Sequence, residues 1–263
     1  QPVKRLPASN WQHAQEALLN TRPYSRHMVE LTQSLLSVLK PGAHTLLRRA
    51  EDGKVALVVI ASDHGLCGGF NANIVHETMR LLAEDFAEKE VELTVIGRKA
   101  GDALRRRPCT IRAAYTGFLD QYSVSPDTAL VDPLIEGFIN GELGQVCCLY
   151  NEFKSAMTQR IALERLLPYE PEETVSGPEP MYLFEPSPEA VIFALLRENL
   201  YAQMHRMFHE SLASEQGARM VEMDSATNNA RNVIDKLTLK YNRVRQDAIT
   251  KEVVEIISGA EAL

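Results

Sequence analysis

The residues best placed for chemistry lie in one turn, Ser62-Asp63-His64-Gly65-Leu66-Cys67-Gly68-Gly69-Phe70-Asn71. An apolar run precedes this turn and a helical pattern follows it, which is where a phosphate-binding turn would lie. Its glycines, Gly65, Gly68 and Gly69, fit neither GxGxxG nor the P-loop pattern, and no lysine follows them. We therefore interpret them as a structural turn that uses positive φ and close packing, with a small-nucleotide-binding α/β enzyme as the alternative.

The same turn holds the residue types of two nucleophilic sites. Ser62, Asp63 and His64 could form a hydrolase triad by type, but three consecutive side chains point in different directions and cannot converge. Cys67 could be a nucleophile at a helix N-terminus, where the thiolate is favoured. No partner base can be identified by spacing, so no catalytic residue is predicted.

Two further groups of side chains could bind a ligand. His205 and His209 are spaced i, i+4 on a helical pattern and could bind zinc, but the glutamate of HExxH is absent, which favours a surface face. The run Arg105-Arg106-Arg107 indicates a solvated face or a contact with an acidic partner. The sequence therefore predicts neither a metal site nor a bound cofactor.

Composition narrows the class of protein. The chain has 263 residues and a net charge of −7, which argues against nucleic-acid binding. No apolar run reaches the roughly 18 residues needed to span a bilayer, so no direct membrane insertion is expected. Cys67, Cys109 and the adjacent pair Cys147-Cys148 form no CxxC motif, which indicates reduced, buried thiols.

The elements that would position the turn alternate along the chain. A continuous apolar run at 55–60 predicts a buried strand, and helical spacing predicts a helix at 71–86. Further elements are expected from the same patterns: strands at 91–96, 146–150 and 181–184, a strand or edge hairpin at 157–166, a short helix or turn at 98–106 and a helix at 132–140. This order predicts a parallel, Rossmann-like sheet.

Helices are expected at both ends of the chain. Residues 11–39 show helical spacing, with a kink or restart expected at Pro23. No proline follows Pro188, so one helix is predicted from there to the end. A helix of about 70 residues is about 105 Å long, so much of it should project and find a partner. The predicted organisation is an N-terminal helix (1–50), an α/β domain (51–186) and a long C-terminal helix (187–263), the two helices forming an antiparallel coiled coil.

A seam runs along the C-terminal helix in steps that alternate between three and four residues, the period of a coiled coil. Its members are Met220, Met223, Thr227, Ala230, Ile234, Leu237, Tyr241, Val244 and Ala248. Beyond it, Val253, Val254, Ile256 and Ile257 make the helix apolar nearly all round, which predicts an apolar sleeve supplied by other chains.

Two stretches resemble the gamma subunit of rotary ATP synthases. Residues 61–74 (ASDHGLCGGFNANI) are similar to the central signature of that family. The C-terminal half repeats its other motifs: SLASE from Ser211, ARM from Ala218, MDSATNN from Met223, IDKL from Ile234, YNR from Tyr241 and AITKE from Ala248. The resemblance covers roughly residues 14–263, and the C-terminal motifs are highly specific.

The resemblance implies a non-catalytic rotor shaft of an F-type ATP synthase. Its partners would be the alpha and beta subunits of the catalytic ring, the epsilon subunit and the membrane ring of c subunits. Contacts with the beta subunits would map onto Arg219, Gln246 and Thr250. The family usually begins with a longer basic helix carrying a Thr-Lys-Ala-Met-type motif, which this sequence lacks, so part of the seam's partner helix is expected to be absent or altered.

Two expectations complete the interpretation. The implied location is the cytoplasmic face of the bacterial inner membrane, as a peripheral protein, with mitochondria and chloroplasts as alternatives. A generic coiled-coil scaffold unrelated to ATP synthesis stays open beside the nucleotide-binding enzyme.

Overall fold

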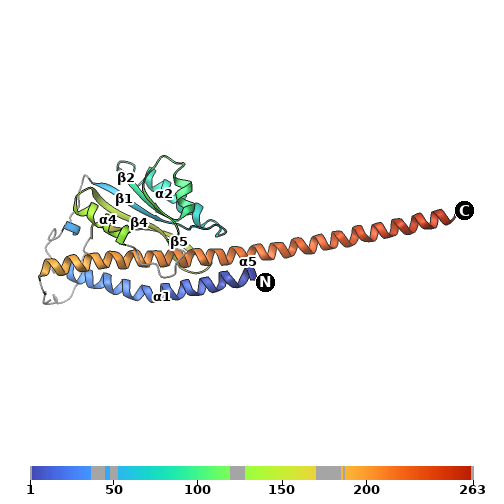
Figure 1. Ribbon diagram of the computed structural model, residues 1–263, viewed down its shortest axis with the longest axis horizontal. Helices are drawn as coiled ribbons and strands as arrows, with labels where there is room; N and C mark the ends of the chain where they lie inside the picture. Colours follow the sequence, from blue (N-terminus) through green and yellow to red (C-terminus); the bar gives the residue numbers. More distant parts are fainter. Residues whose placement is uncertain are drawn as a thin grey trace. The chain divides into compact units, whose positions relative to one another are not determined.

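The computed structural model describes residues 2–36, 45–47, 53–118, 128–169, 185 and 187–261 (Figure 1). The chain divides into two units, Gln1–Val221 and Glu222–Leu263, which are treated separately below. Helix α5 (Pro188–Glu261) contributes residues to both units. Within the described residues, no helix carries a segment long and apolar enough to cross a bilayer.

A five-stranded sheet with the order β3-β2-β1-β4-β5 forms the centre of the first unit. Its members are β1 (Lys54–Ile60), β2 (Val91–Ile96), β3 (Thr110–Tyr115), β4 (Leu143–Phe153) and β5 (Gln159–Leu167). The first four run parallel, and β5 pairs antiparallel with β4 at one edge. Val55 pairs with Val91 in β2, which fixes the register between these strands.

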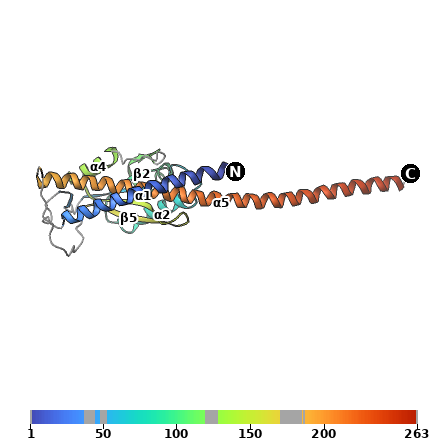
Figure 2. The same ribbon diagram turned by 90° about the horizontal axis from the view of Figure 1, so that it is seen from below.

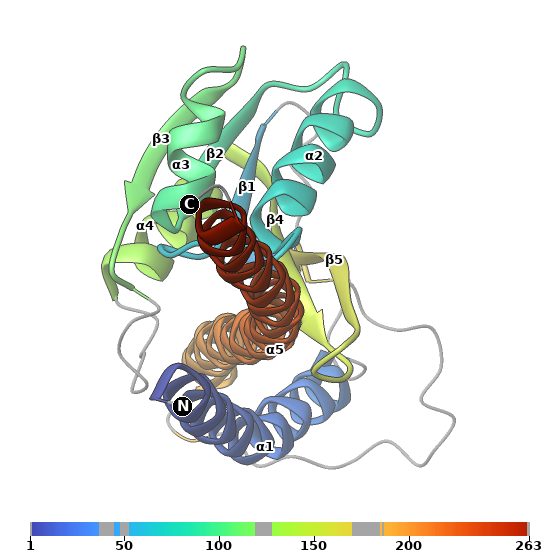
Figure 3. The same cartoon turned by 90° about the vertical axis from the view of Figure 1, so that its right-hand side faces the viewer.

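Alternate residues of β1 enter different cores because successive side chains of a strand point to opposite faces. Val55, Leu57 and Val59 pack on the face covered by α2 (Phe70–Ala83) and α3 (Arg98–Leu104). Ala56, Val58 and Ile60 pack on the other face. That face is covered by α4 (Thr128–Ile139), α5 and α1 (Pro2–Leu36), and a 3-10 turn (Thr45–Leu47) adds Leu46 to the same core. Figure 3 shows α2 and α4 on opposite sides of the sheet.

Helices α1 and α5 run side by side in opposite directions, as two perpendicular views show (Figures 1 and 2). Leu18 of α1 and Leu212 of α5 belong to one buried cluster. Ser214 donates a hydrogen bond from Oγ to the carbonyl of Asn151 in β4, at 3.0 Å. Small residues on this stretch of α5 permit close approach: a Cβ on Gly217 would lie 3.1 Å from the Cα of Ala156. The N-terminal part of α5 is therefore a core helix of the first unit.

The expected kink at Pro23 does not interrupt α1, which is one helix from Pro2 to Leu36. Proline removes the hydrogen bond to the carbonyl four residues earlier, here that of Leu19. Pro23 is exposed and Leu19 is 54 % exposed, so solvent can satisfy the freed carbonyl. The helix therefore continues through the proline.

Most expected elements occur with bounds a few residues different, but α1 begins nine residues before the expected residue 11, and one strand was missed. Strand β3 was not expected. Its residues alternate between exposed and half-buried and therefore form no continuous apolar run, and the polar segment Arg105-Arg106-Arg107-Pro108 directly precedes them. The sheet is parallel as expected except for the edge strand β5. The expected strand at 181–184 and the first helix's expected end near residue 39 lie outside the described residues.

The second unit is helical as far as it is described. Every classified side chain from Asn228 to Ile256 is exposed. Lys251 and Glu255 form an ion pair in this unit, with 3.9 Å between nitrogen and oxygen. Because its side chains are largely exposed, the helix of this unit gains little from packing within this chain.

Candidate functional site

The turn after β1 lies at the carboxyl edge of the parallel strands, where ligands usually bind in α/β sheets. Asp63, which is 4 % exposed, lies at this edge. Its Oδ1 accepts a hydrogen bond from the N–H of Arg98 after β2, and its Oδ2 accepts one from the N–H of Gly117 after β3, both at 2.9 Å. One carboxylate thus joins the ends of three strands and occupies the N–H groups that a phosphate would need.

Gly97 makes this arrangement possible at the start of α3. Its φ is +99°, and a Cβ there would lie 2.2 Å from the carbonyl oxygen of Ala61. Only glycine can bring the backbone after β2 so close to the end of β1. No local sequence pattern indicated the importance of Gly97 or this role of Asp63.

Inside the turn, Asn71 holds the backbone in place. Its Oδ1 accepts the N–H of Ser62 at 3.0 Å, and its Nδ2 donates to the carbonyl of His64 at 3.2 Å. The Ser62 hydroxyl donates to the same carbonyl at 2.6 Å. Ser62 and Asp63 are therefore structural, and the side chain of His64 is exposed.

The three glycines of the turn differ in conformation. Gly68 has a φ of +57°, whereas Gly65 and Gly69 lie outside the positive-φ region. The non-glycine Leu66 has a φ of +63°, and its side chain is 72 % exposed. A Cβ on Gly69 would lie 3.0 Å from Nδ2 of Asn73, so packing limits this position.

The turn contacts α5 on its other side. Nε and Nη2 of Arg219 both lie 3.4 Å from the carbonyl oxygen of Gly65, and Nη2 is ion-paired with Glu215. Cys67, Phe70 and Ala218 form a small apolar cluster beside these polar contacts. Burial raises the pKa of the Cys67 thiol, so this cysteine lacks the thiolate character of a nucleophile.

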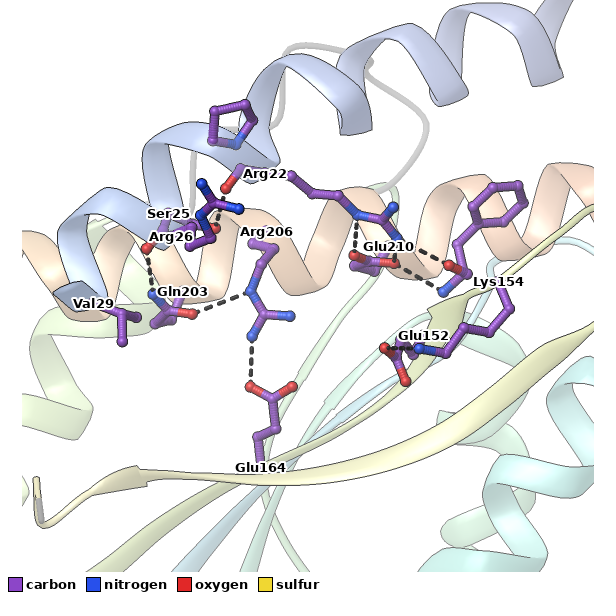
Figure 4. Close-up of a pocket in the computed structure, with 12 residues that line it drawn as sticks. Arg22, Ser25, Arg26, Val29, Glu152, Lys154, Glu164, Gln203, Arg206 and Glu210 are labelled. Atoms are coloured by element: carbon purple, nitrogen blue, oxygen red, sulfur yellow. Dashed lines mark hydrogen bonds and ion pairs between the residues drawn. The ribbon is translucent and has the colours of Figure 1, made fainter. Parts of the chain in front are cut away.

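A polar joint connects α1, β4 and α5 (Figure 4). The carboxylate of Glu210, which is 3 % exposed, accepts hydrogen bonds from Nε and Nη2 of Arg22 at 2.8 and 2.9 Å. It also accepts the N–H of Phe153 at 2.8 Å, while Nη2 of Arg22 donates to the carbonyl of Phe153 at 2.9 Å. Hydrogen bonding to Glu210 raises the pKa of Arg22. One glutamate thus satisfies groups from three elements.

The joint borders a cavity of about 720 Å³ between α1, α5 and the β4–β5 hairpin. On its other side Arg206 is ion-paired with Glu164 (Figure 4). Arg206 also donates to the Tyr150 hydroxyl at 3.0 Å. Lys154 is ion-paired with Glu152 at 2.6 Å. Because these cations already have carboxylate partners, the cavity offers little excess positive charge for an anionic ligand.

The histidine pair on α5 does not form the expected surface face. His209 is 4 % exposed and His205 is half-buried, and their Nε2 atoms lie 3.2 Å apart. The surface face was expected because the HExxH glutamate is absent, but that absence argues only against a zinc motif, and this part of α5 is covered by the rest of the unit. Burial, and then the neighbouring His205, lower the pKa of His209 to about 4.

The predicted contact residues lie in two environments. The side chain of Arg219 is 14 % exposed and occupied within the first unit, whereas Gln246 and Thr250 are exposed on the second. The seam changes in the same way along the helix. Met220, Met223 and Thr227 are half-buried, and the members from Ala230 onward are exposed. Ile234 and Leu237 are each 60 % exposed.

Comparison with known proteins covers nearly the whole chain. The family model described as ATP synthase matches residues 3–263. Proteins called ATP synthase gamma chain are similar in sequence: that of Geobacter metallireducens is 41 % identical over 99 % of this chain and 91 % of its own length. That of Anaeromyxobacter sp. is 42 % identical over 99 % and 92 %.

Solved structures share the fold. The central stalk and c-ring structure of the Tetrahymena thermophila mitochondrial ATP synthase holds a chain with a TM-score of 0.63 and 24 % identity, covering 86 % of this chain and 98 % of that one. A chain of the Euglena gracilis mitochondrial ATP synthase has a TM-score of 0.60 and 18 % identity, covering 97 % and 95 %. These findings favour neither a nucleotide-binding enzyme nor an unrelated scaffold. The chain belongs to the ATP synthase gamma chain family.

Proposed function

We propose that the chain is the central rotor shaft of an F-type ATP synthase, which transmits torque between the ion-driven membrane ring and the catalytic subunits. The single observation that supports this beyond family membership is the exposed apolar surface of the second unit, on the seam and beside it. Leucine, isoleucine, valine and tyrosine side chains there are half to three-quarters exposed, from Val233 to Ile256. Exposed apolar surface of this extent is typical of a surface that other chains cover.

The chain itself performs no bond chemistry in this proposal. The turn that would hold a phosphate is occupied by Asp63, and Cys67 is a protonated, buried thiol. The active sites would lie on the beta subunits. Rotation would give each beta subunit different contacts in turn, and differential contacts are what shift a protein between conformations of different nucleotide affinity.

The exposed residues Gln246 and Thr250 would contact the beta subunits, and Arg219 would reach them only at the cost of its contacts with Glu215 and Gly65. The α/β domain would contact the epsilon subunit and the c ring. The protein would then lie at the cytoplasmic face of a bacterial inner membrane, held there by these partners.

A complete complex, in which the chain is assembled with the alpha and beta subunits and the membrane ring and reconstituted in vesicles, tests this function. Gln246→Leu should weaken the coupling between ATP hydrolysis and ion pumping without altering the fold, because a polar contact that depends on rotor angle is lost. Asn232→Leu makes the same chemical change at another exposed position of the helix and serves as control. Unchanged turnover and coupling in Gln246→Leu would count against the contact.

Two outcomes would favour the alternatives. Tight, stoichiometric binding of ATP or NAD to the isolated chain, lost on changing Gly68, would favour a nucleotide-binding enzyme. A stable homodimer that fails to co-purify with alpha and beta subunits would favour a scaffold. Co-purification with both subunits is the result that the proposed function requires.

A further inference from the structure

Two histidines on successive turns of α5 share a hydrogen bond between their Nε2 atoms, in which the tautomers decide which nitrogen donates. A metal ion that binds both nitrogens would displace the shared hydrogen. Nε2 of His205 and Nε2 of His209 lie 3.2 Å apart, and the rings meet nearly at right angles, with an interplanar angle of 78°. Neither residue takes part in the polar joint or in the turn described above. The rotor function gives this pair no role.

The distance between the two nitrogens suits chelation of one metal ion. Imidazole nitrogens bind Zn²⁺ at about 2.0–2.1 Å, and two such bonds from atoms 3.2 Å apart enclose an angle of about 100°. That angle lies between the octahedral and tetrahedral values. The helix holds the two rings in place because residues four apart are neighbours on its surface.

We propose that His205 and His209 form a two-histidine site for a divalent transition-metal ion of borderline softness, Cu²⁺ or Zn²⁺. Imidazole is a preferred ligand for both ions. Among the described residues, no group of three or more histidine, cysteine or carboxylate side chains forms a metal cluster. Water would therefore fill the remaining positions, on the side of the half-buried His205.

The second nitrogen of His209 limits the affinity of the site. With Nε2 on the metal, Nδ1 must carry the hydrogen, and Nδ1 is buried with no hydrogen-bond partner among the described residues. Ligating histidines usually donate this hydrogen to a carboxylate or carbonyl, and loss of such a partner weakens metal binding about 10–100-fold. The site should accordingly be weaker than one with that support, and Cu²⁺ should bind more tightly than Zn²⁺.

Electron paramagnetic resonance of the metal-stripped full chain, titrated with Cu²⁺, tests the site. The expected result is one Cu²⁺ ion per chain with two imidazole nitrogens in its equatorial plane. His205→Gln should reduce the affinity by at least about tenfold and leave one imidazole. Because His205 is half-buried, this variant should fold, which Trp11 fluorescence and circular dichroism would verify.

Control variants distinguish Cu²⁺ binding at this pair from Cu²⁺ binding at other histidines of the chain. His64→Ala and His76→Ala remove exposed single histidines and should leave both affinity and spectrum unchanged. His209→Ala should behave as His205→Gln does. Cu²⁺ affinity in His205→Gln equal to that of the parent chain, or a parent spectrum with a single imidazole, would overturn the proposal.

Discussion

The two parts of α5 carry similar residues in opposite environments. In the first unit, Leu212 is 2 % exposed and packs with α1 and the sheet. In the second, Leu237 is 60 % exposed. Helical pattern alone does not separate the two parts, since both have apolar residues at regular spacing. The difference shows that one part of a helix can be built into its own domain while another part of the same helix leaves its apolar residues exposed.

Polar contacts follow the same division. The first part of α5 contributes Glu210 and Ser214, both at most 3 % exposed, to contacts with other elements of the unit, and its buried Glu215 is ion-paired with Arg219 of the same helix. In the second part, Thr227 donates to the carbonyl of Met223 and Lys251 is ion-paired with Glu255, and both contacts lie within the helix itself. The polar contacts of the first part hold α5 within its own unit. The exposed side chains of the second part would instead be available to partner subunits whose contacts change as the shaft rotates.

The same leucine substitution in both parts should give the largest contrast. Leu212→Ala should lower the free energy of unfolding by about 2–5 kcal/mol, because it leaves a cavity in a close-packed core. Leu237→Ala should change it by less than about 0.5 kcal/mol in the isolated chain. Urea unfolding measures both variants when it is followed by the single tryptophan, Trp11, which packs against the first unit's core, and by circular dichroism, which also reports the helix of the second unit. Equal losses of stability in the two variants would contradict the difference between the two parts of α5.

The same glutamate substitution in the two parts of α5 should give the second-largest difference in stability. Glu210→Ala should destabilise the first unit by about 2–4 kcal/mol, because the N–H of Phe153 and the guanidinium of Arg22 lose their acceptor. Glu222→Ala, at an exposed position, should have an effect of less than about 0.5 kcal/mol. The same denaturation experiment applies, and a Glu210→Ala variant as stable as the parent would show that the joint contributes nothing.

Replacement of Asp63, whose carboxylate joins the ends of three strands, should lower the free energy of unfolding by a smaller amount. Asp63→Asn keeps one acceptor oxygen but faces the N–H of Arg98 or Gly117 with a donor, so a loss of about 1–3 kcal/mol is expected. Asp235→Asn makes the same change at an exposed position of the second unit and should be nearly neutral. If instead Asp63→Asn left stability unchanged, solvent rather than the protein would be satisfying those N–H groups.

Local patterns predicted the strands β1 and β2 and the long helix, because continuous apolar runs and unbroken helical spacing are local signals. The role of Asp63 could not be predicted in this way. Its partners Arg98 and Gly117 lie 35 and 54 residues away, and they become neighbours only when parallel strands align. The burial of His209 was missed for a related reason, since coverage of this part of α5 comes from elements distant in sequence.

The central claim is that other chains cover the second unit's seam in the assembled enzyme. Hydrogen–deuterium exchange of the free chain, compared with the chain in an assembled complex with alpha and beta subunits, tests it most directly. Amides from residues 222 to 256 should exchange quickly in the free chain, because few tertiary contacts protect them, and at least about tenfold more slowly in the complex. Amides of β1 should change little. Equal exchange of residues 222–256 in both states would contradict the claim.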